Sequence, residues 1–160
     1  MTIKLGDKIP SATLKVMTAD GPTGVSTDEL LGKGKAVLFS VPGAFTPTCS
    51  ARHLPGFVDQ ASALKAKGVD RIVCIAVNDV FVMNAWGKSA NVGDSIVMAA
   101  DGNGDFTRAL GLELDATGFG MGKRGQRFAM VTEDGVVKAL YVEAPGEFKV
   151  SAAEYVLGQL

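Results

Sequence analysis

Two short, nearly continuous apolar runs, at residues 36–41 and 71–77, set the strictest limits on how this chain can fold. Such runs are typical of strands that are covered on both faces and lie in the parallel centre of a sheet. The segment between them, residues 49–67, has apolar residues at helical spacing and ends before Gly68, a common residue just after a helix. Together the three segments predict a β-α-β crossover.

Later segments continue this alternation of strand and helix signals. We expect further helices at 80–89 and 151–156, and further strands at 95–99, 127–132 and 136–142. The last two strands form a hairpin in this prediction, because Asp134-Gly135 tolerates the positive φ of a tight turn. Ser151 is the expected cap of the final helix. The pattern predicts an α/β fold of the thioredoxin-like type, with a mixed sheet that has a parallel centre, an antiparallel edge and helices on both faces.

Length and charge restrict the classes of function. A chain of 160 residues with a mean hydropathy of +0.22 has the size of one domain, and we expect residues 1–160 to form one. The 16 basic residues nearly balance the 17 acidic ones and neither sign forms a long block, so we expect no nucleic acid or membrane partner. No run of about 18 apolar residues is present, and the expected location is the cytoplasm.

The cysteine and histidine content argues against several kinds of site. Two cysteines are too few for a disulfide scaffold, so Cys49 and Cys74 are interpreted as separate thiols. A single histidine and the absence of a Cys-x-x-Cys spacing argue against zinc or an iron–sulfur cluster. We therefore expect neither a metal nor another bound cofactor.

The residues around Cys49 predict a reactive sulfur. Thr46 suits the N-cap of a helix and Pro47 suits its first position, which places Cys49 in the first turn. The sulfur then lies near free backbone N–H groups and the positive end of the helix dipole, which stabilise a thiolate. Pro55 should bend this helix shortly after the cysteine, because its ring removes one backbone hydrogen bond.

Ionisation of a thiol alone brings little gain in rate, because the change that populates the thiolate also weakens it as a nucleophile. Fast chemistry needs fixed donors near the sulfur that orient the substrate and stabilise charge on the departing atom. Thr46 supplies a hydroxyl that can donate to a substrate while accepting from a backbone group. Arg127 supplies a permanent positive charge, with Arg124 as its nearest rival.

Residues 42–49 carry the spacing Pro-x-x-x-Thr-x-x-Cys, which resembles the signature of the peroxiredoxins. The longer stretch 41–57 is similar to the type II, or peroxiredoxin-five-like, subfamily of the AhpC/TSA thioredoxin-like superfamily, and the likeness includes residues 127–130. This resemblance implies a thiol-dependent antioxidant enzyme that reduces hydrogen peroxide and alkyl hydroperoxides. It also implies a thioredoxin-like fold and a homodimer.

The resemblance assigns roles to four residues of this chain. It implies that Cys49 is the peroxidatic cysteine, whose thiolate becomes a sulfenic acid, and that Pro42 shields the sulfur. Thr46 and Arg127 complete the implied peroxide site. The match of Arg-Phe-Ala-Met at 127–130 favours Arg127 over Arg124 as the cation.

Cys74 has two interpretations. It lies in the middle of an apolar strand, where a small buried thiol with no role in the reaction is expected. Some type II relatives use a cysteine at this place to resolve the oxidised one, but the strand would have to open before a disulfide could form. No cysteine follows Cys74, so we expect an external thiol, glutathione with glutaredoxin or a thioredoxin, to recycle Cys49.

Two further features lie near the expected site. His53 could share a helix face with Cys49 and activate it, but a structural or supporting role is favoured because Pro55 disturbs that face. The glycine-punctuated stretch 118–125 is expected to be a mobile loop. In that loop Phe119 and Met121 could form an apolar wall that helps to admit alkyl hydroperoxides.

Two alternative functions differ in what they require. A thiol–disulfide oxidoreductase on the same fold would need a second cysteine at the helix start, where Thr46 stands instead. A redox-regulated binding or chaperone module would depend on apolar surface that is exposed when Cys49 is oxidised. We expect the peroxidase, and an assay of peroxide consumption distinguishes it from both alternatives.

Overall fold

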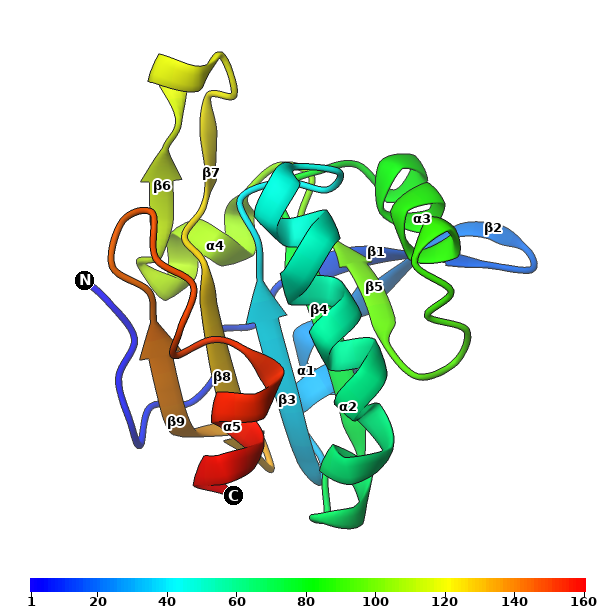
Figure 1. Ribbon diagram of the computed structural model, residues 1–160, viewed down its shortest axis with the longest axis vertical. Coiled ribbons are helices and arrows are strands. Elements are labelled where there is room, and N and C mark those ends of the chain that lie inside the picture. Colours follow the sequence, from blue (N-terminus) through cyan, green and yellow to red (C-terminus); the bar gives the residue numbers. More distant parts are fainter.

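The computed structural model describes residues 1–160 and contains nine strands and five α-helices, with a π-helical turn and a 3₁₀ turn (Figure 1). The strands are β1 (Thr13–Thr18), β2 (Gly21–Ser26), β3 (Lys35–Ser40), β4 (Arg71–Ala76), β5 (Val97–Ala100), β6 (Glu113–Asp115), β7 (Lys123–Gly125), β8 (Phe128–Glu133) and β9 (Val136–Val142). The helices are α1 (Thr27–Leu31), α2 (Leu54–Ala66), α3 (Val80–Ser89), α4 (Asp105–Leu110) and α5 (Ala153–Gln159), with the π-turn η1 (Cys49–His53) and the 3₁₀ turn η2 (Thr117–Phe119).

Seven strands form one mixed sheet in the order β2-β1-β5-β4-β3-β8-β9. The central strands β5, β4 and β3 are parallel. β8 pairs antiparallel with β3, and β9 pairs antiparallel with β8. This arrangement confirms the predicted parallel centre and the hairpin of β8 and β9. A second antiparallel edge, formed by β1 and β2, was not expected, because the glycines and proline of β2 hide its strand character.

Both faces of the sheet are covered, as predicted, because β3 and β4 direct apolar side chains to both sides. Val37 and Phe39 of β3 join a core with α2, α3 and α5, whereas Ala36 and Leu38 join a second core with α1 and α4. Figure 1 shows α2 and α5 in front of the sheet and α4 behind it. None of the helices combines the length and apolar character that crossing a membrane requires.

The helix expected at 49–67 is divided into two parts. Residues 49–53 form a π-helical turn in which the N–H of Leu54 donates to the carbonyl of Cys49, and α2 begins at Leu54. Pro55 directly follows this turn and has no N–H, so it cannot donate the α-helical hydrogen bond to the carbonyl of Ala51. The sequence predicted that Pro55 would bend the helix. The structure shows the effect of the proline as a widened, π-helical turn just before it. Gly68 follows α2 with φ of +93°, in agreement with its expected place after the helix.

Two other expectations were wrong. The glycine-rich stretch 118–125 is not an irregular loop: β6 and β7 form a separate hairpin through the 3₁₀ turn, and it projects from the sheet in Figure 1. Ser151 does not cap α5, whose N-cap is Ala152 without a side-chain hydrogen bond. The Ser151 hydroxyl donates instead to the carboxylate of Glu143, and a hydrogen bond to a charged acceptor is stronger than one between neutral groups at the start of a helix.

Asp101, which directly follows β5, provides a test of how the fold is held. Its buried carboxylate accepts hydrogen bonds from the Phe106 N–H and from the N–H and hydroxyl of Thr107, and so replaces the side-chain cap that Gly104 cannot give to α4. We expect Asp101→Ala to lower the free energy of unfolding by about 3 kcal/mol, because three donors lose their acceptor. Urea unfolding measures this, and Asp94→Ala, which removes an exposed carboxylate, is the control. Equal stability of the two variants would contradict the assignment.

Candidate active site

The register of the sheet brings distant segments together at one end. Ser40 at the end of β3 pairs with Phe128 at the start of β8, and Phe128 pairs with Val142 at the end of β9. Arg127 and Glu143, one residue beyond these pairs, are therefore neighbours, and the Glu143 N–H donates to the Arg127 carbonyl at 3.0 Å. The segment that carries Cys49 leaves β3 at this same end of the sheet.

Cys49 lies where the sequence predicted, at the start of a helical segment. The helical turns begin at Pro47, and the N–H of Ser50 donates to the carbonyl of Thr46 at 2.9 Å. The cysteine is fully buried and part of the core formed with α2. Nη2 of Arg127 donates to its sulfur at 3.1 Å, so the structure brings the predicted cation and nucleophile into contact.

Thr46 occupies the position before the first helical residue, but its hydroxyl does not cap the helix. The hydroxyl donates to the carbonyl of Gly43 at 2.7 Å, whereas it had been expected to accept from a backbone group and donate to the substrate. Because a carbonyl can only accept, the hydroxyl proton is occupied. Its lone pairs remain available to accept a hydrogen bond from a hydroperoxide O–H.

The turn that leads to Cys49 is held in an unusual conformation. Phe45 has φ of +64°, a region that a bulky side chain rarely adopts. The turn is held by a hydrogen bond from the Ala44 N–H to Oδ1 of Asn78 at 2.9 Å. Strain of this kind is found at functional sites, where the surrounding contacts enforce it.

His53 contacts the arginine of the site. Its Nε2 lies 3.0 Å from the carbonyl of Ser151, which can only accept, so Nε2 carries the proton and the unprotonated Nδ1 accepts from Nη1 of Arg127 at 2.8 Å. Burial, followed by the positive charge of Arg127, lowers the pKa of His53 to about 3. The imidazole is therefore neutral near pH 7. This geometry favours the prediction that His53 has a structural or supporting role and does not activate the Cys49 thiol.

Arg124, the rival cation, has a different task. Its guanidinium donates to the carbonyls of Met121 at 3.0 Å and Pro42 at 3.2 Å, and so ties the β6–β7 hairpin to the segment before Cys49. A Cβ atom on Gly43 would lie 2.8 Å from Nη1 of Arg124. The glycine therefore permits the close approach of the hairpin.

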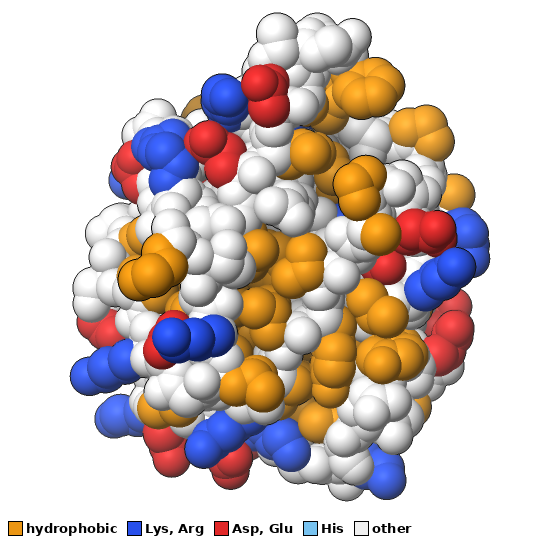
Figure 2. All heavy atoms as spheres, turned by 90° about the vertical axis from the view of Figure 1, so that its left-hand side faces the viewer, with side chains coloured by type: hydrophobic (Ala, Val, Ile, Leu, Met, Phe, Trp, Pro, Cys, Tyr) orange, Lys and Arg blue, Asp and Glu red, His pale blue; other side chains and the backbone are white.

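A cavity of about 390 Å³ opens beside Arg127. Its walls include Pro42, Phe119, Met121 and the loop that follows β9. The structure thus brings together all three residues predicted to contact substrate, although the Phe119 ring is 86% exposed at the tip of the hairpin. Figure 2 shows the face of the molecule that carries β9 and the hairpin, with hydrophobic side chains in its centre and charged ones mostly toward its margins.

Cys74 lies inside the sheet on β4, between Phe39 of β3 and Met98 of β5. It is fully buried, and burial, together with the nearby Cys49, raises the pKa of its thiol well above the usual value. Neither cysteine is in a disulfide. A protonated thiol in the centre of a strand is poorly placed for exchange.

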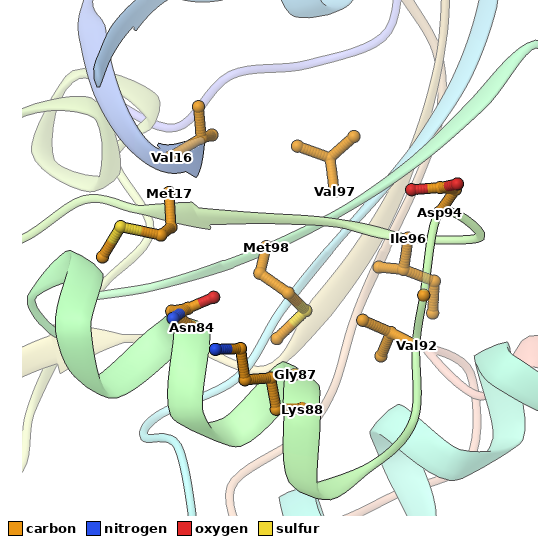
Figure 3. Close-up of a pocket in the computed structure, with 11 residues that line it drawn as sticks. Val16, Met17, Asn84, Gly87, Lys88, Val92, Asp94, Ile96, Val97 and Met98 are labelled. Carbon is orange, nitrogen blue, oxygen red and sulfur yellow. The ribbon is translucent and has the colours of Figure 1, made fainter. Parts of the chain in front are cut away.

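Other candidate sites lack reactive groups. A cavity of about 440 Å³ lies between β1, α3 and β5, and Figure 3 shows Met98 pointing from β5 toward α3, with Met17, Lys88 and Asp94 also among the lining residues. It has no cysteine or histidine in its walls. Nowhere do three His, Cys, Asp or Glu side chains gather as they would around a metal ion.

Comparison with known proteins shows the family to which the chain belongs. The Redoxin family profile matches residues 4–157. Peroxiredoxin-2E-2, chloroplastic, from Oryza sativa subsp. japonica is 51% identical over 164 residues, which cover 99% of this chain and 73% of the relative. Peroxiredoxin-2B from Arabidopsis thaliana is 46% identical, with 99% of this chain and 98% of the relative covered.

A solved structure of high sequence identity shows the same family and fold. Reduced Prx3 from Vibrio vulnificus in complex with hydrogen peroxide is 52% identical, covers 99% of each chain and superposes with a TM-score of 0.95. These matches cover nearly the whole chain, including every segment that carries a residue of the site. The chain therefore belongs to the peroxiredoxins, the thiol-dependent peroxidases of the thioredoxin-like AhpC/TSA superfamily.

Proposed function

We propose that the chain reduces hydrogen peroxide and alkyl hydroperoxides through the Cys49 thiolate, with Thr46 and Arg127 as the other catalytic residues. The observation that carries this assignment is the 3.1 Å contact between Nη2 of Arg127 and the Cys49 sulfur. The guanidinium keeps its charge at any working pH and offers several donors in a fixed plane. It can therefore stabilise both the thiolate and the charge that develops on the departing oxygen.

The proposed chemistry has two stages. The thiolate attacks the terminal OH oxygen of the peroxide, and the S–O bond forms as the O–O bond breaks, which leaves Cys49 as a sulfenic acid. The departing oxygen carries the negative charge and takes a proton from the solvent to leave as water or an alcohol. Thr46 accepts a hydrogen bond from the peroxide, and Pro42 keeps bulk water from the sulfur. In the second stage one external thiol displaces water from the sulfenic acid, and another thiol releases the thiolate by disulfide exchange.

The proposed reductant is an external thiol, glutathione with glutaredoxin or a thioredoxin, and no bound cofactor takes part. The burial of Cys74 supports this proposal, because a disulfide between Cys74 and Cys49 would require β4 to open. Cys74 as a resolving cysteine remains the alternative. Peroxide reduction through an external thiol needs only the sulfur of Cys49 to become accessible after oxidation.

The cavity beside Arg127 supports a preference that includes organic peroxides. Hydrogen peroxide needs little of a 390 Å³ space, whereas an alkyl group could pack against the apolar side chains of Phe119 and Met121. We propose that these two residues bind the alkyl part of the substrate. Arg124 supports this wall by holding the Met121 carbonyl.

Assembly and location remain predictions. We propose a homodimer, and two exposed aromatic rings support it: Phe45, 54% exposed and close to Trp86, and Phe81, 64% exposed on α3. Exposed aromatic side chains are typical of surfaces that bind other proteins. A location in the cytoplasm is likewise still an expectation.

The assignment of the two cysteines can be tested by peroxide consumption. We expect Cys49→Ser to reduce turnover of hydrogen peroxide to the uncatalysed background, because it removes the nucleophile. Cys74→Ser should keep full turnover with glutathione and glutaredoxin or with thioredoxin. Activity in purified Cys49→Ser would contradict the function itself. Complete loss of turnover in folded Cys74→Ser with every external thiol would show instead that Cys74 resolves the oxidised enzyme.

The substrate wall can be tested by comparing two peroxides. We expect Phe119→Ala to lower kcat/KM for cumene hydroperoxide about fivefold, because apolar contact area is lost, and to leave the value for hydrogen peroxide unchanged. Steady-state rates with both substrates give the ratio. Leu5→Ala, which truncates another exposed apolar residue, is the control. An unchanged preference between the two peroxides in Phe119→Ala would remove Phe119 from the substrate site.

A further inference from the structure

A buried carboxylate beside the site takes no part in the chemistry above. Glu143 follows β9 and is only 8% exposed, and its Oε2 accepts hydrogen bonds from the N–H groups of Lys149 at 2.7 Å and Ser151 at 2.8 Å and from the Ser151 hydroxyl at 2.6 Å. Burial raises the pKa of Glu143, but these hydrogen bonds outweigh it and the net pKa is lowered. The ionised carboxylate therefore fixes the turn formed by residues 149–151.

This turn reaches Arg127 in two ways. The carbonyl of Ser151 accepts from Nε2 of His53, which leaves Nδ1 of His53 to accept from Nη1 of Arg127. Phe148, just before the turn, places its ring centre 5.7 Å from the Arg127 guanidinium carbon and 5.0 Å from the centre of the His53 ring. The Glu143 carboxylate thus fixes the turn that supports two contacts of the Arg127 guanidinium, one with His53 and one with Phe148.

We propose that Glu143 and His53 are positioning residues that orient the guanidinium of Arg127 on the Cys49 sulfur. The inference rests on the proposed peroxidase function and adds two residues to it. Glu143 fixes the turn, the Ser151 carbonyl selects the tautomer of His53, and His53 binds Nη1 of Arg127 so that Nη2 points at the sulfur. Neither positioning residue touches the reacting atoms.

Arginine needs such support because its side chain is long and flexible. Arg127 also faces a 390 Å³ cavity, into which an unrestrained guanidinium could turn. Two fixed partners, the sulfur on Nη2 and the imidazole on Nη1, define the plane of the guanidinium. A displacement of about 1 Å from such a geometry can lower a rate about 100-fold.

Three substitutions of His53 separate its contacts. His53→Asn keeps an acceptor near Nδ1 for Arg127, His53→Gln keeps a donor near Nε2 for Ser151, and His53→Phe keeps only the ring, which packs with Phe39 and Phe57. The readout is the rate of Cys49 oxidation by hydrogen peroxide, followed by stopped-flow fluorescence. We expect the rate to fall about 10- to 100-fold in His53→Phe and His53→Gln, and to be largely restored in His53→Asn.

A second reaction distinguishes positioning from a general effect on the fold. Alkylation of Cys49 by iodoacetamide involves no O–O bond, so we expect it to change less than about threefold in the same variants. Glu143→Gln should lower the rate of oxidation about tenfold, because it weakens the anchor of the turn. Glu154→Gln, an exposed residue of α5, is the matched control and should keep the wild-type rate.

The outcomes separate this inference from the function on which it rests. A wild-type enzyme without peroxide consumption that depends on Cys49 would refute the function itself. An active wild type together with wild-type oxidation rates in His53→Phe and Glu143→Gln would refute the positioning role alone. Equal losses in oxidation and alkylation would also refute it, and if His53→Phe does not fold, the rate of Glu143→Gln decides.

Discussion

The proposed peroxide reduction depends on the contact between the Arg127 guanidinium and the Cys49 sulfur. The pairing of strands in the sheet makes this contact possible. A permanently charged group that is partly buried is stabilised when neighbouring groups satisfy its charge and its donors. Here the sulfur and the neutral imidazole of His53 do so, and the imidazole adds no repelling charge of its own. The register between β3, β8 and β9 brings these groups together from segments more than 70 residues apart.

The fold was largely predictable because its central strands have a local signature. The apolar runs that became β3 and β4 direct side chains into two cores and cannot lie at a surface, whatever the rest of the chain does. The β6–β7 hairpin was missed because its strands are three residues long and glycines lie between them. The β1–β2 edge was missed for a similar reason, since Gly21 and Pro22 open its second strand.

The short-range part of the site was predictable from neighbouring residues, whereas the choice of the distant Arg127 depended on the resemblance to a known family. Thr46, Pro47 and Cys49 form a local motif, and the structure places them at the start of a helical segment as expected. The roles of the Ser151 carbonyl and hydroxyl depend instead on two partners outside the final helix, His53 and Glu143, so the residues that follow Ser151 suggested a helix cap. The π-helical turn at residues 49–53 precedes Pro55, which has no N–H to donate. The helix propensities of these residues do not predict whether the chain responds to the proline with a bend or with a widened turn.

The most direct test of this account is the rate of Cys49 oxidation by hydrogen peroxide in wild type, Arg127→Lys and Arg127→Met. Trp86 is the only tryptophan and its Nε1 donates to the hydroxyl of Ser50 at 3.0 Å, so its fluorescence can report the reaction. The account predicts a loss of about 100- to 1,000-fold in Arg127→Met, with only partial recovery in Arg127→Lys, because lysine lacks the planar fork that serves both partners. Oxidation of Arg127→Met at the wild-type rate would contradict it.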